Sequence, residues 1–236
     1  MDRRLFAVGV LGLVTLASGC SLSDGGYKAG ELGNGGFYFS CNDAVACTRY
    51  SNDASKFPQV VSLGSTFDVR FVSKTTDADT HITFNEKAPD RGITINPVGE
   101  YISRGPTGLV ALKSGFGTIT SRDAAGQLVD FVNIRVAKPD ALVVYAAEDA
   151  SETPARIETV TLVKTDRRTY RAFAQEKKAV LAGTLAIEWK SSNSAIVDVE
   201  STSEGKATIV ARAAGSAKLI ATGGTFTQEI SVEVKP

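Results

Sequence analysis

Short stretches in which apolar and polar residues alternate recur along most of this 236-residue chain. Clear examples are residues 67–72 (FDVRFV), 82–84, 93–95, 118–120 and the longer run 129–136 (VDFVNIRV). Alternation with a period of two is typical of a strand that buries one face. Turn signals rich in glycine, for example at residues 90–92 and 124–126, separate the stretches. Short strands at spacings of about ten residues therefore predict an all-β chain of antiparallel sandwiches.

An internal repeat divides this pattern into two units. Residues 108–119 (GLVALKSGFGTI) and 205–219 (GKATIVARAAGSAKL) each contain a strand, a glycine turn at Gly115 or Gly215, and the start of a second strand. Each copy then ends in a terminal strand, the first before Pro139 and the second before Pro236. Self-similarity of this kind predicts related structural units in tandem. We expect two β-sandwiches, covering residues 37–139 and 140–236.

The second unit carries a family resemblance. Residues 187–199 (IEWKSSNSAIVDV), together with residues 205–221, resemble the bacterial immunoglobulin-like domain of group 2, which occurs in proteins of the invasin and intimin type. The resemblance covers about Thr159 to Pro236 and implies an immunoglobulin-like sandwich with Trp189 in its core. The first unit resembles the family mainly in residues 108–136, lacks the Ser-Ser-Asn turn, and is expected to place Phe84 at the tryptophan position.

The first nineteen residues have a different pattern. Arg3 and Arg4 precede an apolar run from Leu5 to Leu16, and small residues lead directly into Cys20. The run is about a dozen residues long, whereas a membrane-spanning helix needs roughly 20, so residues 1–19 are typical of a signal peptide. The sequence Leu-Ala-Ser-Gly-Cys at residues 16–20 resembles the lipobox of bacterial lipoproteins. That resemblance implies cleavage before Cys20 and attachment of a lipid to its thiol.

A lipid on Cys20 would make the membrane the first partner of the mature chain, because two or more acyl chains form a stable anchor. Ser21, rather than an aspartate, follows Cys20, which in a Gram-negative host favours the outer membrane. The host type, and whether the chain faces the periplasm or the cell surface, stay open. Residues 20–36 are rich in glycine and predict a flexible tether between the lipid and the first sandwich.

Charge and cysteine content narrow the chemistry. Without its first nineteen residues, which include two arginines and one aspartate, the chain has 217 residues and a net charge of −1. We expect no nucleic-acid partner, since this balance creates no positive field for phosphates. Cys41 and Cys47 remain after Cys20 and are expected to form a disulfide in an exported protein. Two cysteines without a nearby histidine make a poor zinc site, so neither a metal nor a cofactor is expected.

The most basic segment contains the candidate ligand face. Arg167, Arg168, Tyr170 and Arg171 lie close together and precede Lys177 and Lys178. Such a face could bind a polyanion, for example an acidic glycan or lipopolysaccharide; the alternative is a solvated strand face whose charges discourage pairing with other chains. The remaining polar candidates, for which no partner at catalytic or metal-ligand spacing is visible, are expected to be surface residues: His81, Asp77, Asp79 and Asp90.

No nucleophile motif and no phosphate-binding loop occurs in the sequence, so we expect no enzyme. The lipobox and the sandwich repeat instead predict a lipid-anchored, non-catalytic binding or adhesion module of the cell envelope or surface. Two alternatives stay open. One is a structural subunit that pairs its sheet edges with another envelope protein. The other is a polysaccharide-binding lipoprotein that uses Tyr170 and Phe173 with the neighbouring basic residues.

Overall fold

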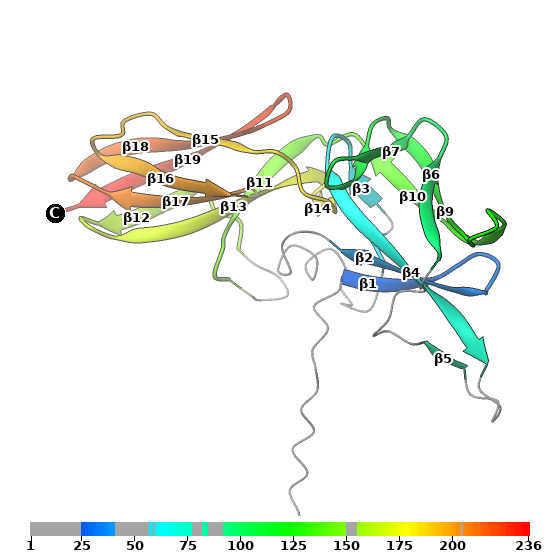
Figure 1. Cartoon of the computed structure of the whole chain (residues 1–236). Helices are drawn as coiled ribbons and strands as arrows, with labels where there is room; N and C mark the ends of the chain where they lie inside the picture. Colours follow the sequence, from blue (N-terminus) through cyan, green and yellow to red (C-terminus); the bar gives the residue numbers. More distant parts are fainter. Residues whose placement is uncertain are drawn as a thin grey trace, which may run out of the picture.

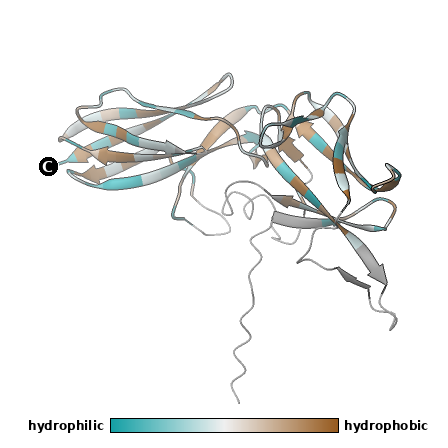
Figure 2. Cartoon of the chain, in the orientation of Figure 1, coloured by the Kyte–Doolittle hydropathy of each residue, from teal (hydrophilic) through white to brown (hydrophobic). Residues whose placement is uncertain are grey.

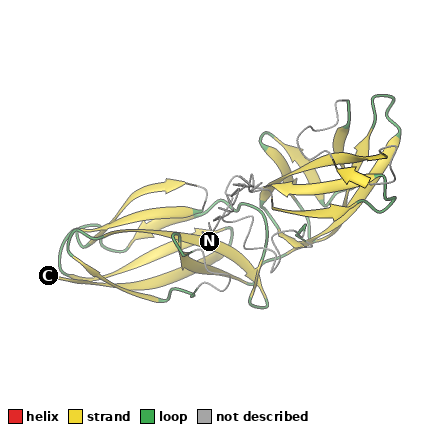
Figure 3. Ribbon diagram, turned by 90° about the horizontal axis from the view of Figure 1, so that it is seen from below, coloured by secondary structure: helices red, strands yellow, loops and turns green. Residues whose placement is uncertain are grey.

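The computed structural model describes residues 25–40, 57–58, 60–76, 82–84, 92–149, 155–203 and 205–236, and these form strands joined by loops and turns (Figure 3). This confirms the prediction of an all-β chain built from immunoglobulin-like sandwiches. None of these residues belongs to a helix that could cross a membrane. Several predicted features lie outside the described residues: the signal peptide, Cys20, Cys41, Cys47, His81, Asp77, Asp79 and Asp90.

Two sandwiches follow one another along the chain (Figure 1). The strands of the first are β1 (Gly25–Ala29), β2 (Gly35–Ser40), β3 (Val60–Ser62), β4 (Thr66–Thr76), β5 (Ile82–Phe84), β6 (Thr94–Val98), β7 (Ile102–Gly105), β8 (Gly108–Ala111), β9 (Gly115–Arg122) and β10 (Leu128–Ala137). The strands of the second are β11 (Ala141–Ala146), β12 (Thr159–Val163), β13 (Arg167–Glu176), β14 (Ala179–Val180), β15 (Glu188–Ser191), β16 (Val197–Ser203), β17 (Lys206–Ala211), β18 (Gly215–Gly223) and β19 (Phe226–Lys235).

The two sandwiches share one topology. In the first, the sheet β1-β2-β4-β8-β7, with β5 on β4, packs against the sheet β3-β10-β9-β6. In the second, the sheet β11-β13-β17-β16, with β14 on β13, packs against β12-β19-β18-β15. The pairs β3–β10 and β12–β19 are parallel. Apart from the additional edge strand β1, the strand orders correspond one to one, and they match the arrangement of immunoglobulin-like folds.

Alternation along the strands produces the cores. Residues of β17 and β19 with even spacing are buried, among them Ile209, Ile230 and Val232, while their neighbours are exposed or partly exposed. The hydropathy colouring shows the same alternation between apolar and polar bands (Figure 2). Removing these apolar faces from water is the main force that holds the two sheets of each sandwich together. The first core is richer in aromatic rings, with Phe39 stacked on Phe67 at 5.4 Å between centroids.

The register of the strands corrects the expected place of Phe84. Gly115 and Gly215 begin the corresponding strands β9 and β18. Six residues further on, Ser121 lies opposite Ile95, and Ala221 lies opposite Trp189. Ile95 therefore occupies the tryptophan position of the first sandwich. Phe84 belongs to β5, which pairs with β4 in the other sheet, because β5 precedes the strand that corresponds to β15.

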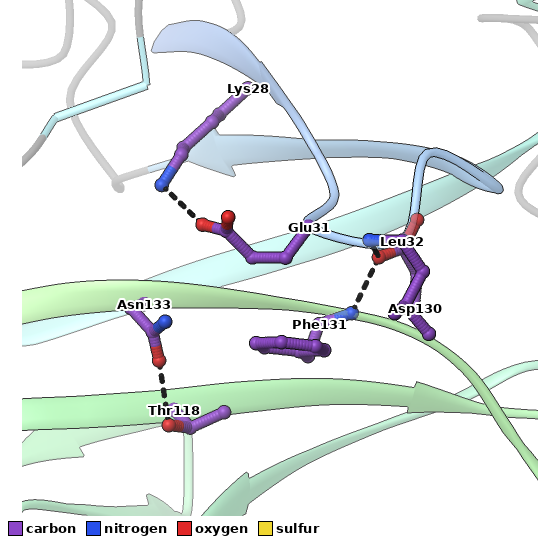
Figure 4. Close-up of polar contacts among 7 residues, drawn as sticks. All are labelled: Lys28, Glu31, Leu32, Thr118, Asp130, Phe131 and Asn133. Atoms are coloured by element: carbon purple, nitrogen blue, oxygen red, sulfur yellow. Dashed lines mark hydrogen bonds and ion pairs between the residues drawn. The ribbon is translucent and has the colours of Figure 1, made fainter.

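The expected flexible tether is wrong for residues 25–36. β1 and β2 form an antiparallel hairpin there, and β1 becomes the outer strand of the first sheet. Asp130, which is fully buried near the start of β10, lies beside the turn at Leu32 and accepts a hydrogen bond of 2.8 Å from the backbone N–H of that residue (Figure 4). It also accepts hydrogen bonds from the backbone N–H groups of Asn34 (2.8 Å) and Gly35 (3.2 Å). A glycine is needed at residue 30, since a Cβ there would lie 2.1 Å from the Asp130 Cγ. This carboxylate orders the glycine-rich turn.

The sandwiches are joined by direct contacts between residues 60–66 of the first and residues 181–185 of the second, which we call the joint. Thr66 and Thr184 exchange two backbone hydrogen bonds of 2.9 and 2.7 Å, and Ser62 donates to the Ala182 carbonyl at 2.9 Å. Leu181 packs with Ala137 and Ala174 in a small buried cluster, with Val60 and Leu185 at its edge. These contacts place the sandwiches end to end, as Figures 1 and 3 show from two directions.

Candidate functional site

A groove of about 650 Å³ lies on the outer face of the second sandwich, over β12, β19 and β18. Inward-pointing residues of these strands fill the core, so the alternate residues line the groove. The strand register arranges them in two rows. The first row runs from Thr159 to Ser231 and Lys218 and ends at Ser192, just beyond β15. The second runs from Thr161 to Glu233 and Ser216.

Short side chains create this groove. Five of the outward residues carry hydroxyl groups: Thr159, Thr161, Ser192, Ser216 and Ser231. The Ser192 hydroxyl accepts a hydrogen bond of 2.8 Å from the Lys218 backbone N–H, which extends the sheet by one residue. Longer side chains at these positions would occupy the space above the sheet, so small hydroxyl residues leave it open.

The groove is polar and nearly neutral. Each hydroxyl can both donate and accept a hydrogen bond. One cation, Lys218, and one anion, Glu233, border the floor, and the Lys218 ammonium pairs with Glu229 at 2.7 Å. The lining contains neither a histidine nor a cysteine that could act as a base or nucleophile. The arrangement fits a ligand rich in neutral hydroxyl or amide groups.

The first sandwich does not carry the two serines of the groove at the corresponding positions. The residues that correspond to Ser192 and Ser216 are Val98 and Phe116, because Val98 lies opposite Thr118 and Phe116 is the second residue of β9. Phe116 is 69% exposed and Val98 is 48% exposed. The two copies of one fold therefore differ at these positions: serines line the groove on the second, and exposed Val98 and Phe116 stand on the first.

The structure changes the predicted ligand face. Tyr170 and Arg171 are neighbours on β13, so alternation sends their side chains to opposite faces of the sheet, and both are buried. Burial raises the pKa of Tyr170 to about 12, and the ring belongs to the core of the second sandwich. Neither side chain can contact a ligand at the surface. Arg167 and Arg168, the other two residues of the predicted ligand face, are exposed.

Two other aromatic residues also lie inside. Trp189 is 5% exposed and its indole N–H donates a 3.2 Å hydrogen bond to the Gly205 carbonyl, which confirms its place in the core. Phe173 is buried on the outer side of β13, with the Arg171 guanidinium carbon 5.9 Å from its ring centroid. The aromatic face that a polysaccharide would stack on is therefore not formed by Tyr170 and Phe173.

Sequence reasoning missed the groove. The sequence does contain polar residues at alternate positions here: Thr159 and Thr161 flank Val160, and Ser231 and Glu233 flank Val232. The sequence alone does not predict the groove, because only the pairing of β12, β19 and β18 brings these residues together. Within the described residues, no three acidic, cysteine or histidine side chains gather as a metal site would require.

The fold places this chain in the class of proteins built from tandem immunoglobulin-like sandwiches. No protein-family model matches the sequence, and no curated protein matches it.

Several solved structures are similar at low identity. Domains 4 and 5 of the S-layer protein SbsC align at 13% identity and a TM-score of 0.34, over 72% of this chain and 82% of theirs. The adhesin InvE of Yersinia pseudotuberculosis aligns at 13% identity and a TM-score of 0.31, over 76% of this chain and 57% of that chain. FdeC, an Escherichia coli adhesin, aligns at 14% and 0.28, over 90% and 66%. The alignments cover only 23–25% of the longer SbsC structures. TM-scores this low transfer no function to this chain.

Proposed function

We propose that this protein is a non-catalytic, lipid-anchored binding module of the cell envelope, held by a lipid on Cys20 and binding its ligand in the groove of the second sandwich. The observation that carries the proposal is the groove itself, an open hollow lined by five hydroxyl groups on one face of a sheet. The lipobox supports the anchor and the envelope location.

The ligand that suits this groove best is a neutral polysaccharide of the envelope. Sugar hydroxyl groups donate and accept hydrogen bonds, as the serine and threonine hydroxyl groups of the groove do. A strongly charged polymer is disfavoured, because the groove lining contains one cation, Lys218, and one anion, Glu233. Binding through hydrogen bonds alone, without an aromatic platform, favours weak contacts repeated along a polymer.

The test uses a bulky residue to fill the groove. Ser231→Arg places a long side chain on the groove floor without touching the core, because residue 231 is exposed on β19. Retention of the purified chain on immobilised envelope polysaccharides should fall at least tenfold. Thr227→Arg is the matched control, since Thr227 is exposed on the same strand and outside the groove lining, and it should keep full retention.

Equal retention of both variants would exclude the groove as the binding site. Co-purification with one protein in fixed stoichiometry, without binding to any polysaccharide, would instead identify a structural subunit. The anchor is tested separately by mass spectrometry of the peptide that begins at Cys20, and Cys20→Ala should release the chain from membranes.

A further inference from the structure

The chain enters the first sandwich close to the joint, and not at an end of the molecule. Gly25, the first residue of β1, lies opposite Phe39, which lies opposite Val69 of β4. Thr66, three residues back along β4, holds Thr184 of the second sandwich through two backbone hydrogen bonds. Three residues of strand and two strand spacings separate Gly25 from this contact, which is roughly 14 Å in all.

The hairpin turn shows which way the far end lies. β1 runs away from the joint towards the turn around Leu32, where Asp130 closes the hairpin. Beside it, β4 continues in the same direction to Thr76, seven residues beyond Val69, so this end of the first sandwich lies about 23 Å from the level of Gly25. The far end of the second sandwich is more distant still, because β19 alone is ten residues, or about 33 Å, long.

The link from the lipid to β1 is short. Gly25 is only five residues beyond Cys20, and a chain of five residues spans at most about 17 Å. A molecule standing upright on the end of its first sandwich would need a link of at least about 23 Å, and standing on its second sandwich would need more. Neither upright arrangement can be reached.

We propose that the protein lies side-on along the lipid headgroups, anchored near its middle, with the joint within about 30 Å of the bilayer surface and the two sandwiches extending in opposite directions. The side of the protein that faces the lipid contacts the same bilayer to which the chain is attached. The inference rests on the proposed lipid at Cys20. It goes beyond the proposed function because it limits the groove to ligands close to the membrane.

Energy transfer from Trp189 to a dansyl group on lipid headgroups measures this orientation. Trp189 is the only tryptophan, and it lies five residues from Thr184 at the joint. Residues 20–236 with Cys41→Ser and Cys47→Ser are coupled through the Cys20 thiol to a maleimide lipid in phosphatidylcholine vesicles. Chemical coupling tests the orientation whether or not cells attach a lipid to Cys20.

The matched variant carries about twenty glycine and serine residues inserted between Asp24 and Gly25, which adds an average reach of about 25 Å. Strong transfer in the original chain and at least a twofold loss in the extended chain are expected. Equally weak transfer in both would overturn the inference. Equally strong transfer would contradict the role of the short link, because the folded part would then stay at the bilayer when the link is long.

A second measurement covers the case in which the serine variants fail to fold. The unaltered chain, purified from cell membranes and placed in the same vesicles, should give the same transfer. If the coupled chain shows strong transfer but the cellular chain carries no lipid on Cys20, the proposed anchor fails while the geometric inference stands.

Discussion

Asp130 illustrates how one side chain can order a segment whose composition suggests a coil. Its carboxylate is fully buried, and it accepts hydrogen bonds from three backbone N–H groups of the hairpin and from that of Phe131 at 2.8 Å. Hydrogen bonds to a charged acceptor contribute more than neutral ones, and buried donors that lose their acceptor carry a desolvation penalty. The glycine-rich turn is stable because of this acceptor.

Replacing Asp130 should therefore destabilise the first sandwich strongly. We expect Asp130→Ala to lower the free energy of unfolding by about 3 kcal/mol, because several buried N–H groups lose their partner. Denaturant unfolding measures the loss, and amide exchange at Leu32 and Asn34 should accelerate first. Asp123→Ala is the control: Asp123 accepts from Ala125 and Gln127 in an exposed turn, and its loss should cost about 1 kcal/mol or less. Equal losses in the two variants would contradict the role of Asp130.

Contacts of single side chains were the part of the structure that the sequence predicted least. The hairpin of residues 25–36 was missed because its acceptor lies about a hundred residues further along the chain. Tyr170 and Arg171 were placed on one face because a run of basic residues conceals the alternation of β13. The strand itself was accessible to pattern reasoning, but the covering of its outer side depends on Val143 and Tyr145 of β11.

Among the elements, the loop between β14 and β15 has a special part in the joint. Gly183 has a positive φ of 90°, and a Cβ there would lie 2.2 Å from the Ser65 Oγ. Glycine adopts this backbone conformation without strain, and it also permits the close approach of the two backbones. The Thr66–Thr184 and Ser62–Ala182 hydrogen bonds depend on that approach.

Gly183→Ala should open the joint while both sandwiches stay folded. We expect a wider distribution of interdomain distances in small-angle scattering, because the added methyl group collides with Ser65. Gly126→Ala is the control that separates backbone strain from the clash with Ser65. Gly126 also has a positive φ, of 78°, but a Cβ there meets nothing within 4 Å. This control should lose about 1 kcal/mol of stability from backbone strain and keep the distances unchanged. An unchanged scattering curve for Gly183→Ala would show that the close approach at Gly183 does not hold the sandwiches in place.

Strand patterns and the repeat were predicted well at this scale. Alternation located the strands β4, β9 and β10, and the matching of Gly115 with Gly215 indicated the shared topology. The groove could not be predicted, because it depends on the register between β12, β19 and β18. Patterns within a strand are local, whereas register and joint are set by partners distant in sequence.

At the level of the whole molecule, an ion pair connects the two sandwiches beside the joint. Arg135 of β10 donates to Glu176 of β13, with one contact of 3.1 Å between Nη1 and Oε1. The hydrogen bond from Arg135 holds the pKa of the Glu176 carboxyl below its ordinary value. Both side chains are partly exposed, so the pair adds little to stability in neutral solution.

The lowered pKa sets the direction of the pH dependence. The contribution of Glu176 is present above the pKa of the unfolded chain, near 4.3, and is lost as the pH falls through the lower pKa of the folded protein. Glu176→Gln should cost less than about 1 kcal/mol at pH 7, and its unfolding free energy should converge with that of the original chain towards pH 3. Thermal unfolding across this range provides the measurement.

A suitable comparison is Glu229→Gln, which removes an ion pair within the second sandwich. This change should leave the distance between the sandwiches untouched at every pH. A constant difference between Glu176→Gln and the original chain from pH 3 to pH 7 would contradict the assignment.

The hairpin strand β1 has a mechanical consequence. With the chain held at Cys20 as proposed and a ligand held in the groove, a pulling force would act first on Gly25, at the free end of β1. Force at this end opens the pairs with β2 one after another, as in peeling, and each opening needs only a small load. Release of β1, residues 25–29, would lengthen the link by about 17 Å and leave the turn held by Asp130 in place. The short connection thus becomes a long one under tension, which would let the sandwiches follow a moving ligand without unfolding.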